Sequence, residues 1–519
     1  MKPAHGLVVS VKNDVGILQQ VAGIAGRFDL VAVALNKLAA NAFLQSLQLP
    51  ASGFRLPADC RGRYWQVSGC RGQVDRGLQR SQGFGVESHV ARLAKIYFYK
   101  IFCHLSDSCR GVTVLENFPA EEHVMASSDG KTRDLVSTLP GAGWDFSLHR
   151  HPYHEVERPL GPHYCVYNRR LMACCFDQRS TEEGYWLLRR KAAVLHTGEY
   201  VLQFRGPDAE RLLDKLFTKD MTRVRVGRCA YGLACYEDGG LLVDGILLRL
   251  EDDCFWYTQA DGDFYSWARA HAIGMEVEIS DPEVFVSQVQ GPNALAILEA
   301  ASDNGMPEPF GYFGVARVSF GGQEIVISRT GYTNELGWEF YTEPRHDADA
   351  LWQHLAAAGE SHGMEIFGLD AMHIRRIEAG ILNAGSDFDR TTTPYEVGLD
   401  RFVDEDKGDF IGKAALQDAP RANRLTGLYC DAEPHIGGEI MVAEGIAGRV
   451  TAGAISPYLR RGIGIGRMDR SGFSEGDQVR IRCIDGELHE GELATLPLYD
   501  KEAEIPRGKR VDIPERAND

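Results

Sequence analysis

Two isolated carboxylates stand in apolar, strand-like surroundings in this 519-residue sequence. Glu339 lies between Trp338 and Phe340 in the stretch ISRTGYTNELGWEFY, which predicts two short strands joined by a turn. Alternation along a strand places Glu339 on the opposite face from the two aromatic rings. Asp244 lies inside the apolar run LLVDGILL, where an acid is costly unless it is paired or hydrogen-bonded. Each carboxylate is therefore either structural, at a surface or a strand bend, or available to bind a ligand and to move a proton.

The chain carries none of the common short catalytic signatures. It has no G-x-S-x-G nucleophile turn, no G-x-x-x-x-G-K-[ST] phosphate loop and no H-E-x-x-H zinc helix. The alternating glycines of RRGIGIGRM lie in β-rich sequence without a following helix, which argues against a dinucleotide-binding loop. The 12 cysteines are dispersed and never spaced as C-x-x-C. This spacing predicts reduced structural thiols and no metal site.

The overall composition is typical of a globular protein, with 44% hydrophobic and 25% charged residues. The apolar stretches are interrupted by charge well before about 18 residues, so we expect no membrane span. The N-terminal residues MKPAHGLVVSVKNDVG lack the basic region, apolar core and cleavage site of a secretory signal. We therefore expect a cytoplasmic protein with no membrane partner.

Charge divides the chain into two parts. The first 120 residues carry 14 Lys and Arg against 7 Asp and Glu, whereas the remainder carries 42 against 66. The acidic remainder argues against a nucleic-acid partner, because phosphate binding needs a cationic face. The basic part, residues 1–124, has little apolar periodicity and is followed by Met125. We interpret it as a basic N-terminal extension, either an over-extended start or a small accessory domain, and assign no function to it.

From about residue 150 the pattern becomes regular and predicts the elements that hold the two carboxylates. Units of strand, Gly-Pro and helix occur twice, at Gly206-Pro207 and at Gly291-Pro292. Asp244 falls in a series of strands broken by a hairpin turn at 237–240. An α+β body with two related halves is predicted over 150–420. Its expected elements are a helix at 181–196, a strand at 199–206, a helix at 208–217, strands across 229–260, and a strand and helix within 284–301.

Residues 421–512 differ from this body. Stretches such as GGEIMVAEGIAGRVTAG and GDQVRIRCIDGELHEGELATL predict short strands joined by Gly or Asp-Gly turns, with almost no helix. A small all-β domain follows, built as a barrel or a sandwich.

Five segments, in order along the chain, resemble the tetrahydrofolate-dependent aminomethyltransferase family of the glycine cleavage system. They are GGLLVDGILL (239–248), RTGYTNELGWEFY (329–341), GLDAMHIRRIEAGILNAGSDFD (368–389), TTPYEVGLDRFV (392–403) and DFIGKAAL (409–416). The resemblance covers about residues 160–505. Within the family, the dimethylsulfoniopropionate demethylase branch is the most similar. The segments that are similar to it are YCVYNRRLMACCFD (164–177), VGRCAYG (226–232), WARAHAIG (267–274), SDFDRTTTPYEVGLD (386–400) and the terminal TLPLYD (495–500).

The resemblance implies an α+β fold of three domains around a central folate-binding channel, with a small C-terminal β-barrel and tetrahydrofolate as cofactor. It places Glu339 where the family's carboxylate accepts the amino group and the adjacent ring N–H of the pterin, a charge-assisted pair. It places Asp244 near the reactive folate nitrogens, as the catalytic residue that orients the cofactor and can move a proton. The resemblance adds three cofactor-binding candidates, of which the first either stacks on the ligand or packs in the core: Tyr332, Arg376 and Tyr499.

The demethylase branch implies a small-molecule methyl donor of the onium type. A methyl group on a positive sulfonium leaves a neutral thioether behind, so the enzyme must chiefly hold that methyl in line with the folate nitrogen. Aromatic faces can hold the cation, and an arginine suits a substrate carboxylate. The candidates for the cation, equally consistent with core packing, are Tyr164, Tyr167, Trp186 and Trp256; those for the carboxylate are Arg460 and Arg461. A homodimer is left open.

Two other functions remain as alternatives. The first is a glycine-cleavage-type aminomethyltransferase acting on a lipoyl protein. Against it, the family's usual opening of Gly-Gly-Trp followed by Met-Pro is absent, and an arginine of those enzymes is replaced by Met372. The second is a non-enzymatic folate-binding protein of the iron–sulfur assembly type, which uses a cysteine in a KGC motif. Here the corresponding stretch is KGDFIGK, with Asp409 in the cysteine's place.

Overall fold

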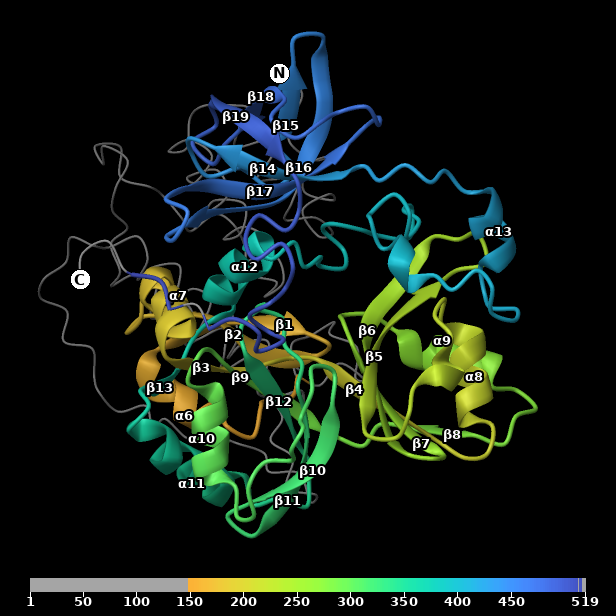
Figure 1. The fold of residues 1–519 in the computed structure, drawn as a ribbon, viewed down its shortest axis with the longest axis vertical. Helices are drawn as coiled ribbons and strands as arrows, with labels where there is room; N and C mark the ends of the chain where they lie inside the picture. Colours follow the sequence, from red (N-terminus) through yellow and green to blue (C-terminus); the bar gives the residue numbers. More distant parts are fainter. Residues whose placement is uncertain (1–147, 512, 516–519) are drawn as a thin grey trace, which may run out of the picture. The chain divides into compact units, whose positions relative to one another are not determined.

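The structure, a computed structural model, describes residues 148–511 and 513–515, all within one compact unit of the chain, Glu122–Asp519. The predicted basic extension, residues 1–124, lies outside the described residues. The described chain begins with α6 (His154–Glu157) and the 3-10 helix η4 (Arg158–Leu160), followed by a hairpin (Figure 1).

The hairpin consists of β1 (Pro162–Tyr167) and β2 (Arg170–Phe176), which pair antiparallel. Asn168 and Arg169 form its two-residue turn with φ values of 49° and 60°, the backbone that matches the twist of a tight hairpin. The Asn168 side chain donates to the carbonyl groups of Gly198 and Gln259. These bonds hold the hairpin tip against the start of the next pair of strands.

Helix α7 (Thr181–Arg190) is shorter than predicted. It begins with a capping box, in which the Ser180 side chain and the Glu183 side chain accept from each other's backbone N–H. The prediction of a helix to residue 196 is wrong, because Lys191 leaves the helical conformation and the next residues form the buried strand β3 (Ala192–His196). A short apolar run does not reveal by its periodicity whether it is a buried strand or a helix.

The larger sheet has six strands in the order β10-β11-β12-β9-β3-β13. All neighbours are antiparallel except β3 and β13. One face is covered by α10 (Ala294–Ala301) and α11 (Ala348–Glu360), and Trp338 and Phe340 belong to the apolar cluster on that face (Figure 1). The remaining strands are β9 (Phe285–Gln290), β10 (Val315–Phe320), β11 (Gln323–Ser328), β12 (Gly337–Thr342) and β13 (Met364–Ile366).

The second sheet has five strands in the order β5-β6-β7-β4-β8. Helices α8 (Ala209–Leu216) and α9 (Phe264–His271) and the 3-10 helix η5 (Met221–Arg223) pack on one face. The other face meets the six-stranded sheet through an apolar layer that includes Trp256 and Tyr341. The strands are β4 (Tyr200–Arg205), β5 (Arg228–Cys235), β6 (Leu241–Glu251), β7 (Cys254–Gln259) and β8 (Glu278–Ser280).

Both predicted units of strand, Gly-Pro and helix are present, as β4 into α8 and β9 into α10. Gly206 and Gly291 have φ values of 134° and 126°. A Cβ would lie 2.5 Å from the Glu276 carbonyl oxygen at Gly206 and 2.6 Å from the Lys191 carbonyl oxygen at Gly291. Only glycine fits at these two turns, each of which returns a helix to its own sheet.

The C-terminal domain is a closed barrel in the order β14-β17-β16-β15-β18-β19, which confirms the predicted barrel. It is reached through α12 (Leu369–Glu378), the 3-10 helix η6 (Asp400–Phe402) and α13 (Lys413–Asp418). Helix α12 contacts α7 and β2 on one side and the barrel strands β16 and β17 on the other. The barrel strands are β14 (Leu425–Cys430), β15 (Glu439–Val442), β16 (Gly445–Ser456), β17 (Arg461–Met468), β18 (Gln478–Arg482) and β19 (Leu488–Ala494).

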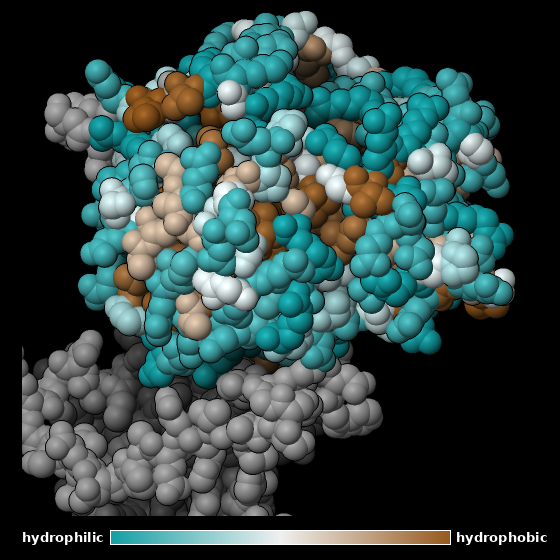
Figure 2. Space-filling view, turned by 60° about the horizontal axis from the view of Figure 1, so that its bottom comes forward, coloured by the Kyte–Doolittle hydropathy of each residue, from teal (hydrophilic) through white to brown (hydrophobic). Residues whose placement is uncertain are grey.

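The face shown in Figure 2 is mainly hydrophilic, with apolar residues in small groups. Exposed large apolar side chains come from separate parts of the fold, such as Val166 in β1, Ile273 after α9 and Ile484 after β18. Among residues 148–511 and 513–515, no helix is long and apolar enough to cross a membrane. The homodimer stays a prediction.

Candidate functional site

Glu339 lies on the face of β12 that points away from the helices and toward the second sheet. It is only 6% exposed, and burial raises the pKa of its carboxyl above the usual value. Its Oε2 accepts hydrogen bonds from the Tyr341 hydroxyl at 3.3 Å, from the Ser328 hydroxyl at 3.5 Å and from the Thr330 hydroxyl. Its Oε1 has no hydrogen-bond partner within the described part of the chain. One oxygen is thus fixed by three hydroxyl groups, and the other is an open acceptor.

The loop after β11 is held in place by Gln290. The Gln290 side chain donates to the Thr330 carbonyl at 3.1 Å and accepts from the Thr333 hydroxyl at 2.8 Å. A Cβ at Gly331 or Gly337 would lie 2.3 Å from the Gln290 side chain, so both glycines are needed for this approach. The loop therefore has one conformation that sets the Thr330 hydroxyl against Glu339.

Asp244 lies on β6 and is 8% exposed. Its Oδ2 accepts from the Tyr231 hydroxyl at 2.7 Å. Burial raises the pKa of Asp244 from the usual 3.8 to about 6, against the lowering effect of the Tyr231 hydrogen bond. The next residue must be glycine, because a Cβ on Gly245 would lie 2.2 Å from the Thr258 carbonyl oxygen. A carboxyl with a pKa near neutrality can take up and release a proton.

Tyr167 and Glu199 lie near the two carboxylates, close enough for the charges of these acids to affect their pKa values. Burial and then the charges of Glu199 and Asp244 raise the pKa of Tyr167, and the charge of Asp244 adds to the larger effect of burial in raising the pKa of Tyr332. Burial and then the charge of Glu339 raise the pKa of Glu199 to about 8. The hairpin tip sets Tyr167 directly over Gly198, where a Cβ would lie 2.9 Å from the Tyr167 Cβ. The predicted residues Asp244, Glu339, Tyr332 and Tyr167 therefore share one region.

Buried carboxylates in the described part of the chain differ in their partners. Glu335, Glu378 and Asp387 form ion pairs with buried arginines. Asp244 and Glu339 form no ion pair with a described residue, and their side-chain partners are hydroxyl groups. The site is therefore left with negative charge that no protein cation neutralises, which favours a ligand that carries N–H groups or a positive charge.

Arg376 lies close enough to lower the pKa of Tyr332, but its guanidinium is engaged elsewhere. It pairs with the buried Asp387 at 2.5 Å and donates to the Ile381 carbonyl at 3.2 Å. These bonds fix the loop whose Leu382 carbonyl accepts from the Tyr332 hydroxyl. The structure shows Arg376 positioning this loop, and its contact with a cofactor stays a prediction.

Tyr499 lies against the arginines that join the barrel to the body. Its ring centroid is 4.9 Å from the Arg189 guanidinium and 5.4 Å from that of Arg375. Both arginines bind the buried Glu335. No hydrogen bond or ring contact connects Tyr499 with Asp244 or Glu339 in the described residues. Contact of Tyr499 with the cofactor therefore stays a prediction.

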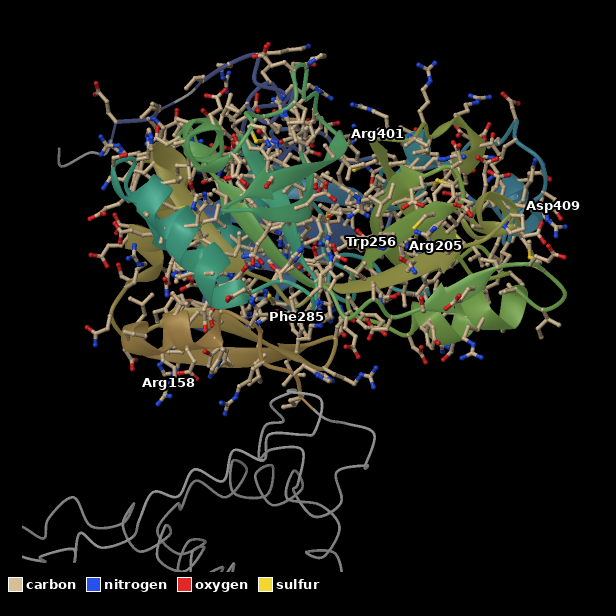
Figure 3. The ribbon with its side chains drawn as sticks, turned by 90° about the horizontal axis from the view of Figure 1, so that it is seen from below. Arg158, Arg205, Trp256, Phe285, Arg401 and Asp409 are labelled. Atoms are coloured by element: carbon tan, nitrogen blue, oxygen red, sulfur yellow. The ribbon has the colours of Figure 1, made fainter. Side chains whose placement is uncertain are left out.

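The remaining aromatic candidates make their contacts with residues other than Asp244 and Glu339. The Tyr164 hydroxyl donates to Glu157 at 3.1 Å, and the Trp186 indole donates to Glu182 at 3.2 Å. Trp256, which is 3% exposed, lies in the apolar layer between the sheets with its ring centroid 5.8 Å from that of Tyr341 (Figure 3). It packs near the tyrosine that donates to Glu339, and its predicted contact with a substrate stays a prediction.

The predicted carboxylate partners belong to the barrel. Arg460 is exposed in the turn between β16 and β17, with φ of 56°. The adjacent Arg461 pairs with Glu492 at 3.2 Å. Met372, 4% exposed, packs in the largest apolar cluster, and Asp409 is exposed just before α13 (Figure 3).

Sequence reasoning missed five residues around the two carboxylates. Tyr341 lies two residues after Glu339, so strand alternation would have found it. Thr330 and Tyr231 lie on the neighbouring turn and strand, 9 and 13 residues before the acids that they bond, and their positions depend on the register of the strands. Glu199 and Gln288 come from distant parts of the chain and give no local signal.

The cysteines in the described part of the chain are all free thiols. Cys430 and Cys483 approach each other inside the barrel, with their Sγ atoms 3.5 Å apart. The same residues contain no group of three or more His, Cys, Asp or Glu that could hold a metal ion.

Comparison with family models gives two matches. The GCVT N-terminal domain matches residues 170–407, and the glycine cleavage T-protein C-terminal barrel domain matches residues 423–500. The second match coincides with the closed barrel of the structure.

Three relatives show comparable similarity to the chain. Trimethylamine-oxide aldolase from Ruegeria pomeroyi is 32% identical over 68% of this chain, which spans about half of that protein (47%). Dimethylsulfoniopropionate demethylase from the same organism is 32% identical over 62% of this chain and 90% of its own length. An aminomethyltransferase from Saccharopolyspora erythraea is 31% identical over 68% of this chain and 98% of its own length.

Among solved structures, glycine cleavage system aminomethyltransferase T from Bartonella henselae has the same fold. The TM-score is 0.62 at 24% identity, and the match covers 68% of this chain and 99% of that one. The predicted α+β body with a C-terminal barrel is confirmed by this likeness.

Proposed function

The chain belongs to the glycine cleavage T-protein family, whose enzymes use tetrahydrofolate, and we propose that it moves a methyl group from a positively charged donor to tetrahydrofolate. The product on the folate side is 5-methyltetrahydrofolate. The observation that carries the proposal is the pair of buried carboxylates, Asp244 and Glu339, that share one region and have no protein cation as partner.

Glu339 fits the binding of the pterin ring of tetrahydrofolate. Its open Oε1 can accept a ring N–H, while three hydroxyl groups hold Oε2 and fix the orientation of the carboxyl. A charge-assisted hydrogen bond of this kind is about twice as strong as a neutral one. Hydrogen bonds from ligand N–H groups would also stabilise the ionised carboxylate and so offset the effect of burial, which raises the pKa of Glu339.

The region around Tyr167 fits a cationic methyl donor. Tyr167 lies close enough to Asp244 for the charge of that acid to raise the pKa of Tyr167, after the larger effect of burial. A sulfonium or ammonium group is attracted both to an aromatic face and to the ionised Asp244, whose side-chain partner is a hydroxyl group. A neutral donor would gain neither interaction.

Asp244 fits the proton transfer that the reaction requires. The secondary amine nitrogen of tetrahydrofolate attacks the methyl carbon, and the carbon–sulfur bond breaks with its electron pair remaining on sulfur as a neutral thioether. The methylated amine then gives up its proton. With a pKa of about 6, Asp244 is mostly ionised at neutral pH and can accept that proton. Tyr231 holds the carboxylate in position through its hydroxyl group.

Dimethylsulfoniopropionate, or a related onium or methylamine compound, is the donor class that we propose. It carries the positive methyl-bearing group that the acids and Tyr167 would attract. Its carboxylate needs a cation, for which Arg460 is the candidate from the sequence.

The proposal is tested with purified full-length protein, tetrahydrofolate and dimethylsulfoniopropionate, following 5-methyltetrahydrofolate and the thioether by mass spectrometry. Asp244→Asn and Glu339→Gln keep the side-chain shapes and are expected to lose the product. The matched control is Glu251→Gln at the end of the same strand as Asp244, where the carboxylate is exposed and pairs with Arg205 at 2.9 Å. It is expected to keep full activity.

Formation of both products, lost in the two site variants and kept in the control, would support methyl transfer. If the protein binds tetrahydrofolate but forms neither product, the donor is wrong, and glycine betaine and dimethylglycine are tested next. If it binds no folate, the proposed function fails.

Aminomethyl transfer is the second candidate, favoured by the aminomethyltransferase from Saccharopolyspora erythraea, 98% of whose length this chain matches. It requires an aminomethyl group on a lipoyl protein as the donor. Release of ammonia and formation of methylenetetrahydrofolate with that donor, and no methyl product with onium compounds, would favour this candidate.

A further inference from the structure

Gln288 carries a buried hydrogen-bond donor that no described residue uses. It lies on β9 and is completely buried. Its Oε1 accepts from the Tyr332 backbone N–H at 3.5 Å, which sets the orientation of the amide. Its Nε2 is buried and has no partner. Leaving such a donor unsatisfied costs about 1–3 kcal/mol, so a residue of this kind in a folded protein calls for an explanation.

The Gln288 donor lies beside the open acceptor of Glu339. The two residues are directly opposite in the antiparallel pairing of β12 and β9. Opposite residues point to the same face of a sheet, with Cβ atoms about 4.5–5.5 Å apart. The structure shows no hydrogen bond between Gln288 and Glu339. A buried donor without a partner on Gln288 thus stands next to the open acceptor of Glu339.

We propose that Gln288 is a specificity-determining residue that recognises the carbonyl group of the pterin ring while Glu339 accepts the neighbouring ring N–H. This inference rests on the proposed binding of tetrahydrofolate. The pyrimidine edge of a pterin presents an amino group, a ring N–H and a carbonyl in succession. A carboxylate can accept from the first two groups, but it cannot bind the carbonyl, which needs a donor. The Gln288 amide supplies that donor at the adjacent position of the sheet.

The neighbouring residues agree with a planar ligand at this place. Tyr332, whose backbone N–H orients the Gln288 amide, has its hydroxyl tied to the Leu382 carbonyl, so its ring is fixed. Gln290, two residues along the same face, has both atoms of its side-chain amide engaged in holding the loop. Of these two glutamines, Gln288 is the one whose Nε2 has no partner and is left to donate to a bound ring.

The test compares tetrahydrofolate with its analogue that has an amino group in place of the ring carbonyl and therefore no hydrogen on the neighbouring ring nitrogen. Because that change also affects the contact with Glu339, the role of Gln288 is read from the effect of one substitution on each ligand separately. Dissociation constants are measured by calorimetry on full-length protein for the wild type and for Gln288→Met, which keeps the length of the side chain without its amide. Wild type is expected to prefer the carbonyl ligand. Gln288→Met is expected to bind tetrahydrofolate about tenfold more weakly and to bind the amino analogue unchanged or more tightly.

A melting curve of the ligand-free protein separates this role from a structural one. Gln288→Met removes an unsatisfied buried donor but also the acceptor of the Tyr332 backbone N–H, two effects of opposite sign, so its melting temperature is expected to stay close to that of the wild type. Gln478→Met, at an exposed position of the barrel strand β18, is the control and should change neither ligand's affinity.

Each outcome decides between the claims. If Gln288→Met binds both ligands as the wild type does, the inference is overturned and the donor serves a bound water. If both ligands weaken equally together with a fall in melting temperature, Gln288 is structural and the inference is likewise overturned. If the wild type binds neither ligand, the proposed function itself is wrong.

Discussion

Replacing Tyr231 by phenylalanine gives a sharp test of the role of Asp244. The Tyr231 hydroxyl donates to Asp244 at 2.7 Å and holds down a pKa that burial raises to about 6. A hydrogen bond to a charged group contributes about 1.5–3 kcal/mol, and one pKa unit corresponds to about 1.4 kcal/mol. Loss of the bond, taken at the lower end of that range, raises the pKa of Asp244 by about one unit, to about 7.

The expected result is a displaced pH profile. Because Asp244 must be ionised to accept the proton, kcat/KM rises with pH through its pKa. At about pH 6 the ionised fraction falls from about one half in the wild type to about one tenth in Tyr231→Phe, an activity loss of about fivefold. Above about pH 8.5 the carboxyl is ionised in both proteins, and the two activities converge.

The assay is the initial rate of 5-methyltetrahydrofolate formation with the methyl donor, measured from about pH 5 to pH 9. Tyr257→Phe is the matched control, since Tyr257 is also buried but donates to the Gly232 carbonyl at 3.2 Å. Tyr257→Phe should leave the acidic limb of the pH profile of kcat/KM at the same pH as in the wild type. An equal loss of activity at every pH in Tyr231→Phe would refute the assignment of the limb to Asp244.

Three further predictions concern affinity and stability. Glu339→Gln removes a charged acceptor and is expected to weaken tetrahydrofolate binding by about 100-fold in calorimetry; binding within about threefold of the wild type would contradict the assignment. The pKa of Glu199 is about 8 in the folded protein against a usual 4.5, so the stability it contributes is present below about pH 4.5 and lost as pH rises through about 8. Glu199→Gln should therefore raise the melting temperature more at about pH 9 than at about pH 5, and an equal rise at both would speak against a neutral buried Glu199. Arg375→Met breaks buried ion pairs with Glu335 at 2.9 Å and is expected to reduce the free energy of unfolding by about 3–5 kcal/mol in urea denaturation; Arg205→Ala, in an exposed pair, should lose less than about 1 kcal/mol and serves as the reference.

Local patterns in the sequence determined the elements and the two central acids. Alternation alone placed Glu339 on the face opposite Trp338 and Phe340, because successive strand residues point to opposite sides of a sheet. The glycines of the two Gly-Pro turns marked strand ends, since their backbone conformation excludes other residues. The all-β character of the C-terminal domain followed from short strands with frequent Gly turns, whereas the choice of a barrel over a sandwich came from the family resemblance. Each of these signals acts over a few neighbouring residues.

The same local signals failed where packing decides the outcome. The stretch 181–196 reads as one helix, yet it divides at Lys191 because Ala192–His196 completes the interior of a sheet whose other strands are distant in sequence. Tyr499 and Arg376 could be matched to a family pattern, but the sequence did not show their neighbours. Tyr499 packs against the guanidinium groups of Arg189 and Arg375, and Arg376 pairs with the Asp387 carboxylate.

Only the tertiary structure decided which side chains surround the two acids. Gln288 stands beside Glu339 because β9 pairs with β12, a contact between segments about 50 residues apart. Tyr231 meets Asp244 through the pairing of β5 with β6, and Tyr167 joins them because a hairpin tip rests on Gly198. A sequence displays residue types and local periodicity. The state of a buried donor or carboxylate depends on partners that long-range pairing supplies, so the sequence singled out the two acids and the fold determined which side chains surround them.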